Sequence, residues 1–290
     1  MIDTRCMSDI RGLPLARRAL EVAAAGGHHV LLIGPPGSGK TMLAFRFPGL
    51  LPPLDEATAN EAQRIRLLAF RGPTDSASID GVGPARLLRA PHHTVSAQGL
   101  SGSWPRDAWM PRPGELSLAH GGVLFLDELP EFRRACLDTL REPLETGVVS
   151  MWNSQKTVVL PAKFQLIATM TACPCGYLGH PTRPCTCSPA SVERYQDRVR
   201  PLARFFDIAV DLTADTQAPP TRGESSAVIR ERVTRVRAGL VRQDGYQSSV
   251  AATLAEMAQP GGPRLVEHQD EATALRSALI NMLNRKDSDT

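Results

Sequence analysis

Helical and strand-like patterns alternate along the first half of the chain. Residues 14–25 carry apolar side chains at helical spacing and are good helix formers, and residues 54–70 are expected to form another helix. The unbroken apolar runs 30–33 and 123–126 are typical of strands buried on both faces. A glycine-rich loop follows residue 33, and a helix is expected from about Thr41.

The second half continues this alternation. Residues 131–147 predict one helix that ends at its glycine, and residues 148–170 alternate like a hairpin leading into a buried strand over 164–169. The remaining expected elements are a helix capped by Ser188 with Pro189 at its first position, a strand over 206–212 and an amphipathic helix over 225–240. Strands alternating with helices argue for an α/β fold with a mainly parallel sheet covered on both sides.

Composition places the chain among ordinary soluble globular proteins, with 42% hydrophobic and 22% charged residues. Its net charge of +3 does not by itself argue for a nucleic-acid partner. The chain has no run of about 18 apolar residues and no apolar signal peptide, so we expect a cytoplasmic protein without a membrane partner. Thiols stay reduced in that compartment, so the six cysteines do not predict disulfides.

A phosphate-binding pattern, G-x-x-x-x-G-K-[ST], follows the first predicted strand. Its residues are Gly34, Pro35, Pro36, Gly37, Ser38, Gly39, Lys40 and Thr41. The glycines let backbone N–H groups converge on phosphates, and the start of the next helix adds the positive end of its dipole. Lys40 can reach the β- and γ-phosphates of ATP, and Thr41 can offer its hydroxyl to Mg²⁺. The alternative is a glycine turn that binds nothing.

Two carboxylates end the second apolar strand. Asp127 and Glu128 directly follow residues 123–126. Beside a phosphate loop, Asp127 can hold the Mg²⁺ shell and Glu128 can polarise the attacking water. The alternative is a strand end with solvated acids.

Four cysteines form two C-x-C pairs separated by nine residues: Cys173 with Cys175, and Cys185 with Cys187. Four thiolates on two short turns can make a tetrahedral structural Zn²⁺ site. The alternative is four free cysteines in a surface loop. The adjacent residues His92 and His93 are expected to point apart, as side chains do in an extended segment.

Several longer strings carry a family resemblance: GHHVLLIGPPGSGKTMLA, RAPHHT, RPGELSLAHGGVLFLDELPEF and LREPLETG. Over residues 10–210 the chain resembles the magnesium chelatase-like AAA+ ATPase family, ComM/YifB branch. The resemblance implies an αβα sandwich with a mainly parallel five-stranded sheet, ATP hydrolysis with Mg²⁺, and a ring, expected to be a hexamer, of this chain or of this chain with a longer paralogue.

The resemblance also divides the chain. It implies an AAA+ core over 1–213 with the cysteine-rich insertion 172–188, a linker over 214–223, and a truncated helical lid with a polar tail over 224–290. Family members carry an N-terminal Lon-protease-like domain, and this chain begins almost directly at the AAA+ module, so we expect it to lack that domain and most of the lid.

Two catalytic positions depart from the family pattern. Thr171 stands where the family has the asparagine that orients the attacking water, so we expect its hydroxyl to serve with a shorter reach. At the arginine-finger position the chain has Phe205, and Arg204 lies one place earlier as the candidate substitute. A missing finger can reduce the rate by about 10³-fold or more. Lys40 and Glu128 complete the expected catalytic set.

Three functions remain open at this point. In the first, the resemblance implies ATP hydrolysis coupled to remodelling of single-stranded or branched DNA, including branch migration. The second is a chelatase-type regulatory assembly ATPase without DNA activity. The third is a truncated ATP-binding paralogue with weak hydrolysis, which the altered positions favour.

Overall fold

The protein is described by a computed structural model that covers residues 5–69, 86–105, 108–153, 156–215, 221–240 and 250. The described residues group into two compact units. Unit 1 comprises those within Met1–Pro52, Asp127–Pro130 and Ile167–Thr290, and unit 2 those within Pro53–Leu126 and Glu131–Leu166. Residues 216–220 of the predicted linker 214–223 lie outside the described residues, as do residues 241–249 and 251–290 of the predicted lid and tail.

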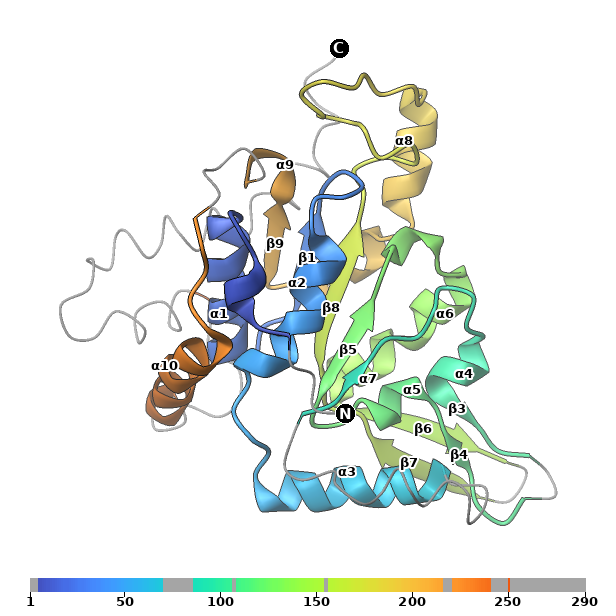
Figure 1. Ribbon diagram of the computed structural model, residues 1–290. Helices are drawn as coiled ribbons and strands as arrows, with labels where there is room; N and C mark the ends of the chain where they lie inside the picture. Colours follow the sequence, from blue (N-terminus) through green and yellow to red (C-terminus); the bar gives the residue numbers. More distant parts are fainter. Residues whose placement is uncertain are drawn as a thin grey trace. The chain divides into compact units, whose positions relative to one another are not determined.

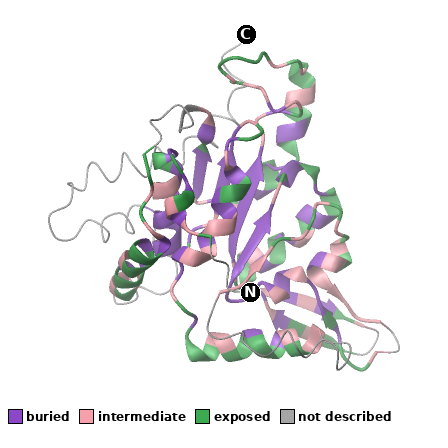
Figure 2. Cartoon of the chain, in the orientation of Figure 1, coloured by how far each residue is buried: buried purple, intermediate pink, exposed green. Residues whose placement is uncertain are grey.

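A five-stranded parallel sheet confirms the predicted α/β fold class. Its strand order is β2-β5-β8-β1-β9. The strands are β1 (Val30–Ile33), β2 (Leu88–Arg89), β5 (Val123–Leu126), β8 (Gln165–Met170) and β9 (Ile208–Asp211). β1 and β5 have the predicted bounds, and every residue of β1, β5 and β8 is buried, as Figure 2 shows in purple.

Unit 1 contains most of the described helical residues of the chain's two ends, and α1 (Pro14–Gly26) and α9 (Leu212–Asp215) pack on β1. Its other helices are η1 (Met7–Asp9), α2 (Lys40–Arg46), η2 (Phe47–Leu50), α8 (Pro189–Asp197), η5 (Arg200–Phe205) and α10 (Ser226–Leu240) (Figure 1). α1 contacts β1, β9 and α10. It ends at Gly27, whose φ of 77° is the left-handed conformation that glycine supplies at a helix C-terminus.

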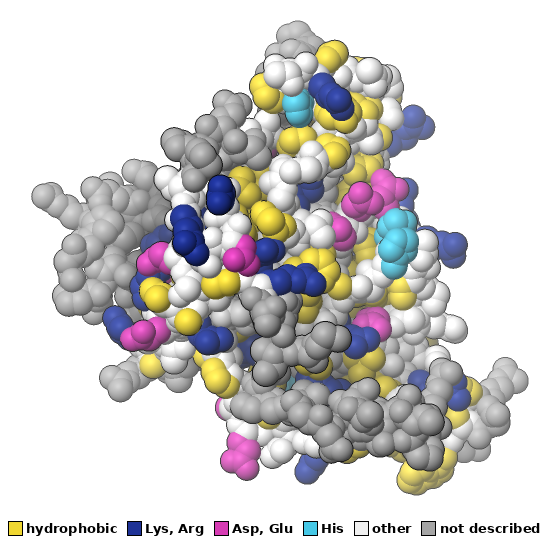
Figure 3. Space-filling view, viewed as in Figure 1, with side chains coloured by type: hydrophobic (Ala, Val, Ile, Leu, Met, Phe, Trp, Pro, Cys, Tyr) yellow, Lys and Arg dark blue, Asp and Glu magenta, His cyan; other side chains and the backbone are white. Residues whose placement is uncertain are grey.

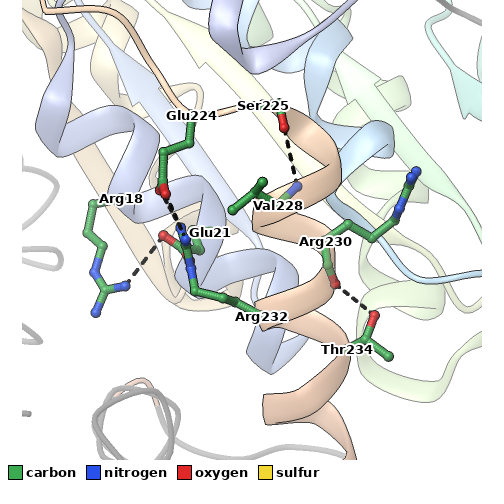
Figure 4. Close-up of polar contacts among 8 residues, drawn as sticks. All are labelled: Arg18, Glu21, Glu224, Ser225, Val228, Arg230, Arg232 and Thr234. Carbon is green, nitrogen blue, oxygen red and sulfur yellow. Dashed lines mark hydrogen bonds and ion pairs between the residues drawn. The ribbon is translucent and has the colours of Figure 1, made fainter. Parts of the chain in front are cut away.

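An ion-pair network holds α10 to α1. Glu21 is buried in α1 and accepts a 2.7 Å hydrogen bond from Nε of Arg232. The guanidinium of Arg232 also donates to both carboxylate oxygens of Glu224, at 2.9 and 2.6 Å, and Arg18 lies 3.5 Å from Glu21 (Figure 4). Ser225 accepts from the N–H of Val228 and caps α10. The helix predicted to begin the lid therefore packs on the core of unit 1.

Unit 2 combines short helices with two small antiparallel ribbons. Its elements include α3 (Glu56–Ala69), α4 (Ala97–Ser101), β3 (Gly102–Ser103), β4 (Arg112–Pro113), α5 (Glu115–Leu118), β6 (Val148–Trp152) and β7 (Thr157–Pro161). β6 and β7 form the predicted hairpin, with Val148 paired to Pro161 and Trp152 paired to Thr157. The sequence pattern did not predict α4.

The single helix predicted over 131–147 is wrong. The structure has the turn η4 (Leu129–Glu131) and two short helices, α6 (Arg134–Thr139) and α7 (Arg141–Thr146). Pro143 lacks a backbone N–H, and its ring clashes with the carbonyl four residues earlier in a continuous helix. That carbonyl belongs to Thr139, where α6 ends.

Within the described residues, no helix combines the length and the hydropathy that a membrane span requires.

Candidate nucleotide site

The phosphate loop connects β1 to α2 at the carboxyl end of the sheet. The N–H of Gly34 donates to the carbonyl of Met170 on β8, at 3.2 Å, so the loop starts against the neighbouring strand. Gly39 has a φ of 91°, and a Cβ there would lie 3.2 Å from Cδ1 of Leu13. The sequence therefore needs glycine directly before Lys40, the first residue of α2.

Lys40 is folded back onto this loop. Its ammonium donates to the carbonyls of Gly34 at 2.7 Å and Pro35 at 2.8 Å, and lies 3.4 Å from Oγ of Ser38. Burial lowers the pKa of Lys40, while the carboxylates of Asp127 and Glu128 act in the opposite direction. The sequence thus places a buried cation between the loop carbonyls and the acidic strand end.

Asp127 lies beside the first turn of α2. The hydroxyl of Thr41 donates to its carboxylate, 3.1 Å from Oδ2 and 3.3 Å from Oδ1. Thr169 on β8 donates to Oδ1 at 2.5 Å and accepts from the N–H of Glu128 at 2.9 Å. The hydroxyl of Thr169 therefore fixes both acidic residues relative to β8.

Glu128 has an unusual backbone conformation. Its φ is 54°, one of two positive values among the described non-glycine residues. Non-glycine residues pay a steric penalty in this region, and such strain concentrates at functional sites. The side chain is exposed, so its carboxylate is open to solvent next to Asp127.

Thr171 follows β8 and is engaged by the segments after it. Its hydroxyl donates to the carbonyl of Cys173 at 2.8 Å and lies 2.9 Å from the hydroxyl of Tyr195 on α8. Since the Thr171 proton goes to the carbonyl, Tyr195 is the donor in the second bond. The hydroxyl expected to orient water therefore already has two protein partners.

Arg204 is the next-to-last residue of η5. Its guanidinium carbon lies 4.7 Å from the centroid of the Phe205 ring, a cation–π contact between the two residues that share the predicted finger position.

The four predicted cysteine ligands come together. Their sulfur atoms all lie within 4.8 Å of one another, and those of Cys173 and Cys175 are 3.4 Å apart. Cys173 is buried and accepts from the N–H of Leu178. Backbone hydrogen bonds from Tyr177 and Thr186 lower the pKa of Cys175 to about 6. Four converging thiols with backbone N–H donors are the donor set of a closed Zn²⁺ site.

The expectation that His92 and His93 point apart is wrong. Their ring centroids are 4.0 Å apart. The N–H of Val95 donates to the carbonyl of His92, which closes a turn, so the segment is not extended and the side chains do not alternate.

Thr169 and Tyr195 were not identified by sequence reasoning. A lone threonine inside an apolar strand is also typical of an ordinary buried strand. The role of Thr169 depends on the position of β8 between β5 and β1, and that strand order cannot be predicted from the local sequence.

Residues 6–219 match the family described as magnesium chelatase, subunit ChlI. The chain is 38% identical to YifB of Salmonella typhimurium over 288 residues, 96% of this chain and 53% of that protein. It is 42% identical to YifB of Escherichia coli over 80% of this chain and 44% of that protein. It is 41% identical to competence protein ComM of Haemophilus influenzae over 81% of this chain and 45% of that protein.

The chain therefore spans about half the length of the curated relatives it matches. These relatives and the parallel sheet support an AAA+ ATPase. The chain belongs to the magnesium chelatase ChlI family, in the branch of YifB and ComM.

Proposed function

We propose that this chain binds ATP with Mg²⁺ in the loop between β1 and α2 and hydrolyses it. The observation that carries the proposal is the contact of Thr41 with Asp127, which brings the hydroxyl of the phosphate loop to the acidic strand end. A hydroxyl and a carboxylate at this separation suit the oxygen-rich shell of Mg²⁺.

Each residue has a defined role in this proposal. Lys40 leaves the carbonyls of Gly34 and Pro35 and places its ammonium on the β- and γ-phosphates. Thr41 and Asp127 hold Mg²⁺, which neutralises phosphate charge when bound. Glu128 accepts the proton of the attacking water.

Turnover is expected to be slow in the isolated chain. The hydroxyl of Thr171 is occupied by Cys173 and Tyr195, so it is poorly placed to orient water. The finger position carries Phe205, and the neighbouring Arg204 is held over that ring. The binding groups do not depend on either position, so tight ATP binding with little phosphate release is the expected behaviour.

The test compares Lys40→Ala with Lys156→Ala, an exposed lysine in unit 2. Titration with a fluorescent ATP analogue in Mg²⁺ should show at least about tenfold weaker binding for Lys40→Ala, because a hydrogen bond to a charged group contributes about 1.5–3 kcal/mol. Lys156→Ala should bind like the unchanged chain. Equal affinities for all three proteins would overturn the nucleotide proposal.

We further propose that ATP turnover acts on DNA in an oligomeric ring. Trp109 and Trp152 support the DNA part of this proposal: they are 86% and 75% exposed, near β4 and at the end of β6. Exposed aromatic rings on ribbons can stack on unpaired bases. On the face in Figure 3, Lys and Arg side chains are interspersed with Asp and Glu.

Phosphate release measured with and without forked DNA distinguishes the motor from its alternatives. Stimulation that disappears in Trp152→Ala supports the DNA motor. Nucleotide-dependent rings without any response to DNA favour the regulatory assembly ATPase, and binding without release in any condition favours the weakly hydrolysing paralogue.

A second proposal concerns the cysteines. We propose that Cys173, Cys175, Cys185 and Cys187 hold one structural Zn²⁺. Elemental analysis of the purified chain should find one zinc per chain, and Cys185→Ser with Cys187→Ser should remove it.

A further inference from the structure

The cysteine loop touches the phosphate loop directly. Gly176 lies between two ligands of the cluster in sequence, and a Cβ on it would lie 2.7 Å from Cδ and 2.9 Å from Cγ of Pro36. Gly176 is buried and has a φ of 85°. In Figure 1 the chain after β8 rises beside the loop between β1 and α2. No side chain separates the turn of the cluster from the ring of Pro36.

A second set of bonds joins the cluster to the end of β8. Thr171 donates to the carbonyl of Cys173, and Gln196 on α8 donates to the carbonyl of Ala172 at 2.9 Å. α8 itself begins directly after the last cysteine, because Ser188 caps it by accepting from the N–H of Ser191. The residues directly after β8 are therefore held by hydrogen bonds both to the cysteine cluster and to α8.

We propose that metal binding at the four cysteines and nucleotide binding at the phosphate loop are coupled, each strengthening the other, through the contact of Gly176 with Pro36. This inference rests on the proposed zinc and nucleotide sites and states a relation between them. A bound ion restricts Cys173 and Cys175 to one arrangement, which sets the turn containing Gly176 against Pro36. Without the ion that turn gains freedom, and the loop must be ordered when nucleotide binds.

Coupling between two sites is reciprocal. If Zn²⁺ raises the affinity for MgATP by a given factor, MgATP must raise the affinity for Zn²⁺ by the same factor. The expected factor is about 5-fold to 150-fold, the usual range for coupled sites. A merely structural ion, which holds its own loop and nothing else, predicts a factor near one in both directions.

The first experiment uses the whole chain. Zinc is removed with a chelator and returned in a titration, and the affinity for a fluorescent ATP analogue is measured with and without it. The affinity for Zn²⁺ is then measured with and without MgATP, using a competing zinc indicator. Equal shifts in the two titrations support the coupling, and equal affinities with and without the partner overturn it.

The second experiment keeps all four thiols. Gly176→Ala pushes a methyl group into Pro36, whereas Gly179→Ala in the same loop meets no atom within 4 Å. Both glycines have positive φ, 85° and 80°, so the control carries comparable backbone strain. We expect both variants to retain one zinc per chain, and only Gly176→Ala to lose nucleotide affinity, by about fivefold or more. Unchanged affinity in Gly176→Ala would overturn the proposed contact route.

Failure of the underlying proposals gives different results. If the purified chain contains no zinc and cannot take it up, the proposed metal site is overturned, and so is this inference. Equal nucleotide binding by the unchanged chain and Lys40→Ala removes the nucleotide site. If zinc and nucleotide both bind normally and neither changes the affinity for the other, the coupling alone is overturned.

Discussion

The hydroxyl of Thr169 donates a 2.5 Å hydrogen bond to Oδ1 of Asp127. The hydroxyl oxygen of Thr169 also accepts from the N–H of Glu128, at 2.9 Å, so one buried hydroxyl holds both acidic residues. The position of the proposed Mg²⁺ ligand is thus set from β8, and the phosphate loop meets it from β1.

Thr169→Val tests this arrangement. Valine keeps the shape but leaves the N–H of Glu128 without its acceptor, so the free energy of unfolding should fall by about 1–3 kcal/mol. Affinity for MgATP should fall about tenfold, since Asp127 loses a donor of similar value. The comparison is Thr157→Val on β7, which is exposed and should change stability by less than about 0.5 kcal/mol. Equal effects of the two changes on nucleotide affinity would contradict the role of Thr169.

The backbone at Glu128 is expected to be strained, because the site needs a carboxylate at a position where glycine would fit without strain. At a φ of 54°, glycine and asparagine are tolerated and a β-branched residue is not. Melting temperatures of Glu128→Gly and Glu128→Asn should therefore equal or exceed that of the unchanged chain, and Glu128→Val should melt lower. All three changes should abolish phosphate release. A melting temperature for Glu128→Val above that of Glu128→Gly would show that the strain is absent.

The contact between α1 and α10 should depend on Arg232. Glu21 is buried, and Arg232 is its partner at 2.7 Å with 37% of its own side chain exposed. Arg232→Ala should therefore destabilise unit 1 by about 1–3 kcal/mol in urea unfolding, less than a fully buried pair would cost. Arg235→Ala is the control on the same helix: Arg235 and Glu231 are both 76% exposed, and its change should stay within about 0.5 kcal/mol.

Acidification should destabilise the fold around His120. Nδ1 of this buried ring accepts from the N–H of Lys163, and Nε2 lies 3.1 Å from Glu61. Burial lowers the pKa of His120 despite the opposing effect of Glu61, while Lys163 and Arg66 lower it further. The folded chain therefore binds this proton less readily than the unfolded chain, and stability falls as pH drops below about 6.5.

Replacing His120 measures that effect. The loss of melting temperature between pH 7 and pH 5 should be smaller in His120→Asn than in the unchanged chain. A steeper acid loss in His120→Asn would contradict the assignment.

The sequence predicted the parts of the fold that depend on neighbouring residues. The bounds of β1 and β5 follow from two four-residue apolar runs, and the cap of α8 follows from Ser188 and Pro189. The break at Pro143 was also local, and the helix predicted across it neglected the missing N–H.

Relations between distant residues could not be predicted in this way. Arg232 and Glu21 are 211 positions apart, and nothing near either residue specifies the partner. The role of Thr169 likewise depends on strand order. The motif at Gly34–Thr41 and the pair Asp127 and Glu128 predicted which groups form the site. The hydroxyl of Thr169, which bonds to both acidic residues, could be identified only from the sheet.

The path of the chain has a practical consequence for dissecting the molecule. It crosses between the two compact units four times, after Pro52, Leu126, Pro130 and Leu166. No fragment of consecutive residues therefore contains either unit whole without portions of the other. A truncation that removes α1 from one end or α10 from the other takes away a packing partner, because these two helices contact each other. The contribution of each unit to activity must be separated by point substitutions within the intact polypeptide.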